Sequence, residues 1–197
     1  MSASSVVPIP QQAWQLPPRG TVGMVCLIIG ESAIFTIFVV AYVFYIGKSL
    51  AGPTPGEVLQ VPWFTTICLL SSSFTIVRAE HAVANGLIKR FFTWLAVTVA
   101  LGGVFLAGTA NEWHKLIYRD GLTIHTNLFG TTFYSLVGLH ATHVVIGLAM
   151  LLLVLFFTVF GKFDAEHAER FKVLALYWHF VDAVWVVVFT VVYILGR

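Results

Sequence analysis

The chain has 197 residues, of which 58% are hydrophobic and only 10% are charged. A soluble domain carries about 25% charged residues, so this composition, with a mean hydropathy of +0.89, excludes a water-soluble fold. The net charge is only +2, and no block of Lys and Arg is interleaved with aromatic residues, which excludes a nucleic-acid partner.

Five stretches are long and apolar enough to cross a bilayer as helices, which takes about 20 mostly apolar residues. The strands of a β-barrel would instead be segments of about 10 residues with alternating apolar and polar positions. We therefore predict an all-α integral membrane protein, a bundle of five transmembrane helices. The spans are approximately residues 22–46, 63–83, 91–113, 129–160 and 174–196.

The first 20 residues are polar and rich in proline, and they contain no long apolar run. We expect no cleavable signal peptide here, because such a peptide has an apolar core of its own. Residues 1–20 are interpreted as a cytoplasmic N-terminal segment, and residues 21–197 as one membrane domain. The first span must then direct insertion.

Glu31 lies nine residues into the first span, about 13 Å along a helix from its start. Asp182 lies at a similar depth in the fifth span. A proton-handling role for Glu31 and a purely structural hydrogen bond to a neighbouring helix both fit this position. Because an unpaired polar group is costly in the bilayer, we expect Glu31 within hydrogen-bond reach, or one water, of His140, His179 or Asp182.

Arg78, Glu80 and His81 fall near the end of the second span, where long side chains reach the interface. Arg78 and His81 are candidates for contact with a lipid head group, and a surface ion pair is the alternative. The aromatic residues at helix ends are interpreted as an interfacial belt. They are Trp14, Trp63, Trp94, Trp113, Tyr118 and Trp178.

Two pairs of ionisable residues share a helix face because each is spaced by three positions: His140 with His143 on the fourth span, and His179 with Asp182 on the fifth. Metal or haem ligation is one reading. Bundle metal sites, however, usually show more ligands at matched spacing, so we expect this chain to bind neither metal nor haem. The favoured interpretation is that the histidines are neutral and hydrogen-bond between helices, to Asp182, Glu31 or backbone carbonyls.

Orientation follows from the distribution of Lys and Arg, which are enriched on the cytoplasmic side. Seven fall on the side of the N-terminus: Arg19, Arg78, Lys89, Arg90, Lys162, Arg170 and Lys172. Four fall on the other side: Lys48, Lys115, Arg119 and Arg197. This bias predicts a cytoplasmic N-terminus and an external C-terminus.

The segments GTTFYSLVGLHATHVVIG at 130–147 and YWHFVDAVWVVVF at 177–189 resemble subunit III of the haem-copper terminal oxidases, the cytochrome c and quinol oxidases. GMVCLIIGE at 23–31, VPWFTTICLLSSS at 61–73 and TANEWHK at 109–115 resemble earlier helices of that family in the same order. The chain is thus similar to the family from about residue 19 onward. With five helices, it resembles the shorter bacterial form.

The resemblance implies an accessory subunit without a redox site, beside a subunit I that holds haem and copper and a subunit II. Such a subunit supports proton uptake and the stability of the catalytic subunit during oxygen reduction in aerobic respiration, in the bacterial cytoplasmic membrane. Bound phospholipid is possible. Carried over by position, Glu31 corresponds to the family's buried carboxyl. The other members of its buried polar network correspond to His140, His143, His179 and Asp182.

Two other functions fit parts of the pattern. A small subunit associated with nitric oxide reductases would share these motifs. A transporter or channel lined by Glu31, Asp182 and the histidines would instead need inverted repeats and discontinuous helices at the midplane, and the sequence has neither.

Overall fold

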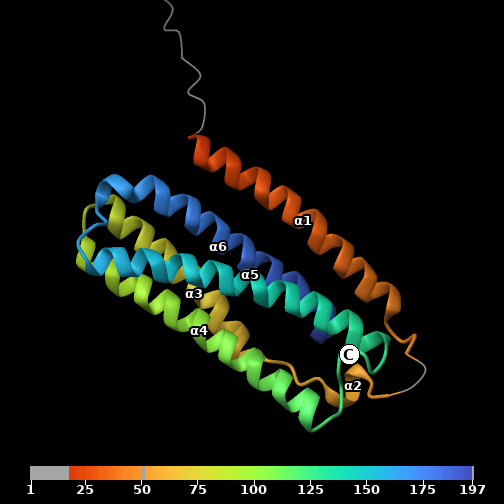
Figure 1. Cartoon of the computed structure of the whole chain (residues 1–197). Coiled ribbons are helices and arrows are strands. Elements are labelled where there is room, and N and C mark those ends of the chain that lie inside the picture. The colour runs from red at the N-terminus through yellow and green to blue at the C-terminus, as the bar shows by residue number, and fades with distance from the viewer. Residues whose placement is uncertain (1–17, 50–51, 197) are drawn as a thin grey trace, which may run out of the picture.

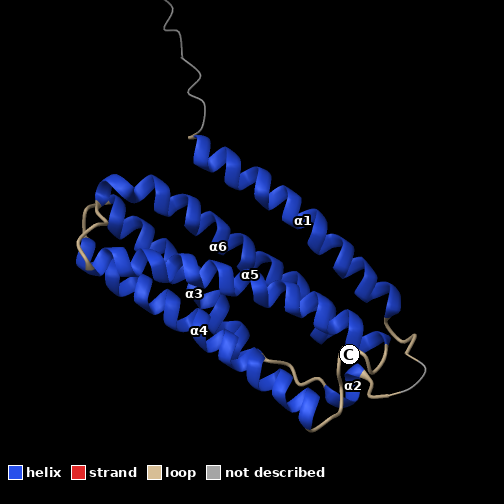
Figure 2. Cartoon of the chain, in the orientation of Figure 1, coloured by secondary structure: helices blue, strands red, loops and turns tan. Residues whose placement is uncertain are grey.

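The computed structural model describes residues 18–49 and 52–196, and this part of the chain contains helices and loops without strands (Figures 1 and 2). The all-α prediction is therefore confirmed. The elements are α1 (Arg19–Tyr45), α2 (Pro55–Val58), α3 (Trp63–Ala84), α4 (Ile88–Tyr118), α5 (Leu128–Val159), the 3₁₀ turn η1 (Ala165–His167), α6 (Ala168–Phe189) and the π-helical end η2 (Thr190–Leu195).

Within residues 18–49 and 52–196, four helical stretches are long and apolar enough to cross a membrane: α1, α4, α5 and the continuous run from η1 through α6 to η2. α3 is shorter and more polar, with the serines at 71–73 and the charged Arg78 and Glu80. Its 22 residues still reach about 33 Å at 1.5 Å per residue, enough for a hydrocarbon core of about 30 Å. The chain is thus a multi-pass helical membrane protein, as predicted.

The helices form antiparallel neighbours joined by short connectors. Gly86 and Gly161, which follow α3 and α5, have φ of +69° and +66°. Only glycine adopts this backbone conformation without strain. α3 packs against α4 and α6, and α5 against α4 and α6. α1 lies at the edge of the bundle and contacts α5 and α6 (Figure 1).

The connector between α1 and α3 contains one feature that its sequence did not predict, the short helix α2. A capping box begins it, in which the Thr54 backbone N–H donates to the Glu57 carboxylate at 3.0 Å. This hydrogen bond holds the pKa of the exposed Glu57 carboxyl below its ordinary value. Glu57 therefore stays ionised at the end of the bundle to which α2 belongs.

Two tryptophans of α6 fill the centre of the bundle. The Trp178 indole N–H donates to Ser72 Oγ at 2.8 Å, and that of Trp185 to Thr66 Oγ1 at 3.2 Å, both across to α3. A Cβ on Gly102 or Gly147 would lie 2.9 or 3.0 Å from the Trp178 ring, so both positions need glycine. Trp178 is fully buried, and its assignment to an interfacial belt was wrong.

Candidate functional site

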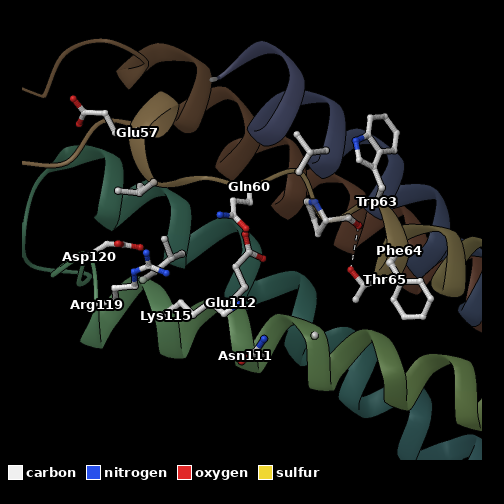
Figure 3. Close-up of a pocket in the computed structure, with 15 residues that line it drawn as sticks. Glu57, Gln60, Trp63, Phe64, Thr65, Asn111, Glu112, Lys115, Arg119 and Asp120 are labelled. Atoms are coloured by element: carbon white, nitrogen blue, oxygen red, sulfur yellow. Dashed lines mark hydrogen bonds between the residues drawn. The ribbon is translucent and has the colours of Figure 1, made fainter.

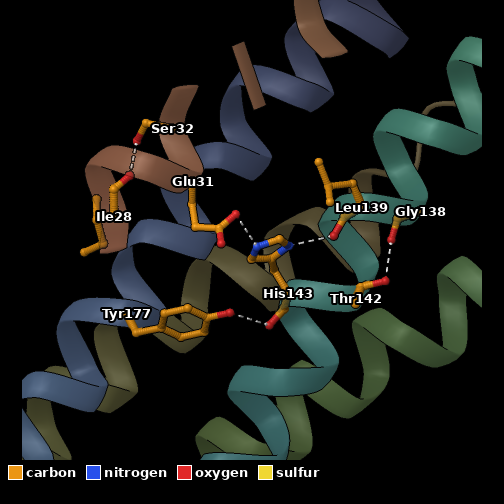
Figure 4. Close-up of polar contacts among 8 residues, drawn as sticks. All are labelled: Ile28, Glu31, Ser32, Gly138, Leu139, Thr142, His143 and Tyr177. Atoms are coloured by element: carbon orange, nitrogen blue, oxygen red, sulfur yellow. Dashed lines mark hydrogen bonds and ion pairs between the residues drawn. The ribbon is translucent and has the colours of Figure 1, made fainter. Parts of the chain in front are cut away.

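The Glu31 carboxylate on α1 meets the His143 ring on α5, with 3.1 Å between Oε2 and Nε2 (Figure 4). The other ring nitrogen, Nδ1, lies 2.8 Å from the Leu139 carbonyl oxygen. The side chain of His143 is 10% exposed and that of Glu31 is 24% exposed. The pair joins the edge helix to the bundle and keeps partial access from outside.

Hydrogen-bond chemistry fixes how many protons this pair holds. A carbonyl oxygen can only accept, so the Nδ1 of His143 must carry a hydrogen and donate it to Leu139. The contact between Nε2 and Glu31 then contains one proton, either on the imidazole as an ion pair or on the carboxyl as a neutral pair. The site can pass that proton between its members without changing its total charge.

The partner of Glu31 confirms one expectation and narrows another. A buried histidine was expected to hydrogen-bond Glu31 between helices, and His143 does so. Among the described residues, Glu31 makes no direct hydrogen bond to His140, His179 or Asp182, the group expected within its reach, and Asp182 points toward α3. Depth along a helix does not say toward which neighbour the helix turns a side chain.

His179 and Asp182 of α6 meet at one serine of α3. The Ser73 hydroxyl donates to Asp182 Oδ2 and lies 3.1 Å from His179 Nδ1. Because its single hydrogen goes to Asp182, Ser73 accepts from His179, which places a hydrogen on Nδ1. Asp182 is 3% exposed, and its Oδ1 has no hydrogen-bond partner among the described residues.

His140 lies on the same side of α5 as His143 but in different surroundings. It is fully buried, and neither ring nitrogen has a hydrogen-bond partner in the part of the chain that the structure describes. Its ring stacks on Trp185 at 4.9 Å between centroids and meets the edge of Phe105 at 5.9 Å. The expected interhelical hydrogen bond is thus corrected to aromatic packing at this position.

The lipid candidates lie apart from these groups. The Arg78 guanidinium is 5.9 Å from the Phe74 ring centroid and 5.6 Å from that of Trp94. Both Arg78 and His81 are exposed on the outer surface of α3. Such a cation over aromatic faces at a helix end remains available to an anionic head group.

Three features of the buried network were missed in the sequence. Ser72 and Ser73 supply its contacts on α3, and Glu112 accepts from the Tyr193 hydroxyl at 3.1 Å and 3.0 Å on its two carboxylate oxygens. Glu112 carried the same signal as Glu31, a carboxyl close to an apolar run. The serines are common in membrane helices, so only the fold reveals their partners.

Metal ligation requires several donors at one point. Among the residues that the structure describes, no group of three or more His, Cys, Asp or Glu side chains could hold a metal ion.

Comparison with known proteins agrees with the motifs. Residues 19–197 match the family model described as cytochrome c oxidase subunit III. The chain is 36% identical to cytochrome c oxidase subunit 3 of Alkalihalophilus pseudofirmus over 169 residues, 85% of this chain and 82% of that protein. It is 39% identical to the Synechocystis sp. subunit over 183 residues, 88% and 74%. It is also 32% identical to cytochrome bo(3) ubiquinol oxidase subunit 3 of Pseudomonas aeruginosa over 168 residues, 84% and 80%.

Proposed function

We infer the function from a family relationship: the chain belongs to the cytochrome c oxidase subunit III family and is a subunit of a haem-copper oxidase. We propose that it is the accessory, non-redox subunit of a proton-pumping terminal oxidase in aerobic respiratory electron transport. In this role it supports proton uptake and the stability of the catalytic subunit, while haem and copper belong to subunit I and subunit II completes the complex.

The pair of Glu31 and His143 is the observation that carries this proposal. Its contact between Nε2 and the carboxylate contains one proton, and it is partly exposed at the edge of the bundle. A second group, formed by Ser73, His179 and Asp182, lies between α3 and α6, where Asp182 is buried and Ser73 and His179 are partly buried. The pair of Glu31 and His143 can exchange a proton with its surroundings. The second group fixes α3 against α6.

We further propose a bacterial cytoplasmic membrane location with the N-terminus inside. Arg19, Lys89 and Arg90 lie at helix ends on one side, together with most of the basic residues. This agrees with the rule that Lys and Arg concentrate in cytoplasmic connectors. Arg197 and residues 1–17 of the proposed cytoplasmic segment, with Trp14, lie outside the described residues. The division into residues 1–20 and a membrane domain of 21–197 stays a proposal.

Co-purification tests the proposal. Solubilised in mild detergent, the chain should migrate with a partner whose absorption spectrum shows haem, and the complex should reduce oxygen. Isolation of the chain alone, or in a complex free of haem, would contradict the assignment. A complex that turns over nitric oxide without consuming oxygen would favour the nitric oxide reductase alternative.

A further inference from the structure

A cavity of about 440 Å³ opens at the end of the bundle that carries α2 (Figure 3). Its walls are the connector from α2 to α3, the first turn of α3 and the last turns of α4. Its volume falls within the range of about 300–1,000 Å³ that is common for small-molecule pockets. None of the buried polar groups around Glu31 or Asp182 contributes to it.

The depth of this cavity follows from the length of α4. Glu112 lies 24 residues after Ile88, the first residue of the helix, a distance of about 36 Å against a hydrocarbon core of about 30 Å. Lys115 and Arg119 lie farther along and therefore at head-group level. On the opposite wall, Trp63 and Phe64 are 58% and 72% exposed. The cavity thus joins a polar floor at the interface to an apolar flank that descends along α3.

Two cations on this wall have no partner in direct contact. Lys115 lies in the last turn of α4 and Arg119 is the C-cap one turn farther on, and neither side chain makes a hydrogen bond or an ion pair within 4 Å to another described residue. Lys115 attracts Glu112 electrostatically, but the Glu112 carboxylate is held by the Tyr193 hydroxyl at 3.1 Å and 3.0 Å. The side-chain N–H groups of Lys115 and Arg119 are free to donate to an oxyanion, and Arg suits a phosphate best.

The charge balance of the lining selects among oxyanions. Two cations, Lys115 and Arg119, face three carboxyl side chains, those of Glu57, Glu112 and Asp120. A simple anion therefore meets no net positive field. A zwitterion with a phosphate and an ammonium group would place each charge opposite its complement.

We propose that this cavity binds a phospholipid with an amine-bearing head group, a phosphatidylethanolamine. Its phosphate lies against Lys115 and Arg119, its ammonium group donates to Asp120, and an acyl chain runs down over Trp63 and Phe64. Glu112 forms the inner wall, held in place by Tyr193. The site is distinct from the exposed Arg78 on the surface of α3.

Native mass spectrometry of the oxidase complex, purified in mild detergent, tests the site. The preparation is stripped of lipid and titrated with phosphatidylethanolamine, and the wild type should bind one more lipid than the double variant Lys115→Ala/Arg119→Ala. Each single variant should weaken binding roughly tenfold, the loss typical of one charged hydrogen bond. Lys89→Ala/Arg90→Ala, which removes the same pair of charges at the opposite end of α4, should bind like the wild type.

Three further arms identify the ligand. Asp120→Asn should weaken phosphatidylethanolamine binding and leave phosphatidylglycerol binding unchanged. Glycerophosphoethanolamine, the same head group without chains, should bind far more weakly than the lipid. Equal binding of phosphatidylglycerol by the wild type, full competition by glycerophosphoethanolamine, or equal lipid loss in the Lys89/Arg90 control would overturn the proposal. Haem absorbance of the same sample reports assembly, so failure of the lipid site is separable from failure of the proposed function.

Discussion

Two polar contacts of this bundle bring an acid and a histidine together in different surroundings. At the inner contact, between α3 and α6, Asp182 and His179 meet Ser73. At the edge contact, between α1 and α5, Glu31 meets His143. Glu31 belongs to α1, which buries only two of its side chains. Asp182 is 3% exposed, whereas the side chain of Glu31 is 24% exposed and borders the outside.

This difference separates structural from functional uses of intramembrane acids. A polar group sealed in the core costs much when its partner is removed, because neither water nor lipid head groups can replace it. A pair at the edge can find a substitute partner and can also exchange its proton. Substitutions in the inner contact should therefore change stability, and those in the edge contact should change turnover.

The largest expected effect is that of Trp178→Ala. The change removes a fully buried ring that packs against Gly102 and Gly147 and its hydrogen bond to Ser72, so the free energy of unfolding should fall by about 3–5 kcal/mol. Detergent-titrated unfolding of the purified complex measures this. Trp63→Ala, at a ring 58% exposed, should cost far less, and equal losses would break the distinction between core and edge.

Next in size is Ser73→Ala, which leaves both His179 and Asp182 without their shared partner. A buried group deprived of its hydrogen bond costs about 1–3 kcal/mol, and the same unfolding titration should detect this loss. Ser71→Ala is the matched control, since Ser71 is exposed on the same helix and should leave the unfolding free energy unchanged. A loss at Ser71 as large as that at Ser73 would argue that serine content, and not the contact, matters.

Glu31→Ala should affect stability less and turnover more. Because Glu31 is 24% exposed, losing its bond to His143 should cost about 0.5–1.5 kcal/mol. The initial rate of oxygen consumption should stay near wild type, while the number of turnovers before inactivation should fall. Glu31→Gln separates the two effects, since it keeps a hydrogen bond but carries no titratable proton.

The control for this third prediction is the neighbouring Ser32→Ala. Ser32 is exposed, and its hydroxyl donates to the Ile28 carbonyl of its own helix. Removing this hydroxyl should therefore change neither measurement. Complete loss of activity in an assembled Glu31→Ala complex would contradict a supporting role. Wild-type endurance in the Glu31→Gln complex would mean that the proton of this pair is not used.

The smallest effect belongs to Arg78→Ala, outside both contacts. An exposed guanidinium over the Phe74 and Trp94 rings contributes about 0.5–1 kcal/mol. Thermal inactivation of the complex should shift only slightly. A destabilisation as large as that of Ser73→Ala would show that Arg78 contributes as much to stability as the inner contact does.

Composition predicted the helical class well, because about 20 apolar residues can cross a bilayer only in a few ways. It did not predict how each helix is rotated. In a soluble helix the apolar stripe marks the core-facing side, but lipid is as apolar as a core, so α1 and α5 are apolar on every side. The sequence therefore indicated that a buried histidine pairs with Glu31, but not that this histidine is His143.

Aromatic residues illustrate the same gap from the other direction. Trp178 and Trp63 both lie within a few residues of the start of a predicted span, yet one is fully buried and the other is exposed. The distinguishing signal lies in glycines far away, at 102 and 147, which leave room for the Trp178 ring. The short helix α2 was not predicted for a different reason: the glycines and prolines around it are typical of loops.

The position of α1 at the edge has a consequence for biosynthesis. Glu31 and His143 are 112 residues apart in the chain, so at about 5–20 residues per second the ribosome needs on the order of 6 to 22 s to make the second after the first. During this interval α1 waits in the bilayer without its partner, where a bare carboxylate is costly. Glu31 can therefore gain its partner only after α5 has been made and inserted.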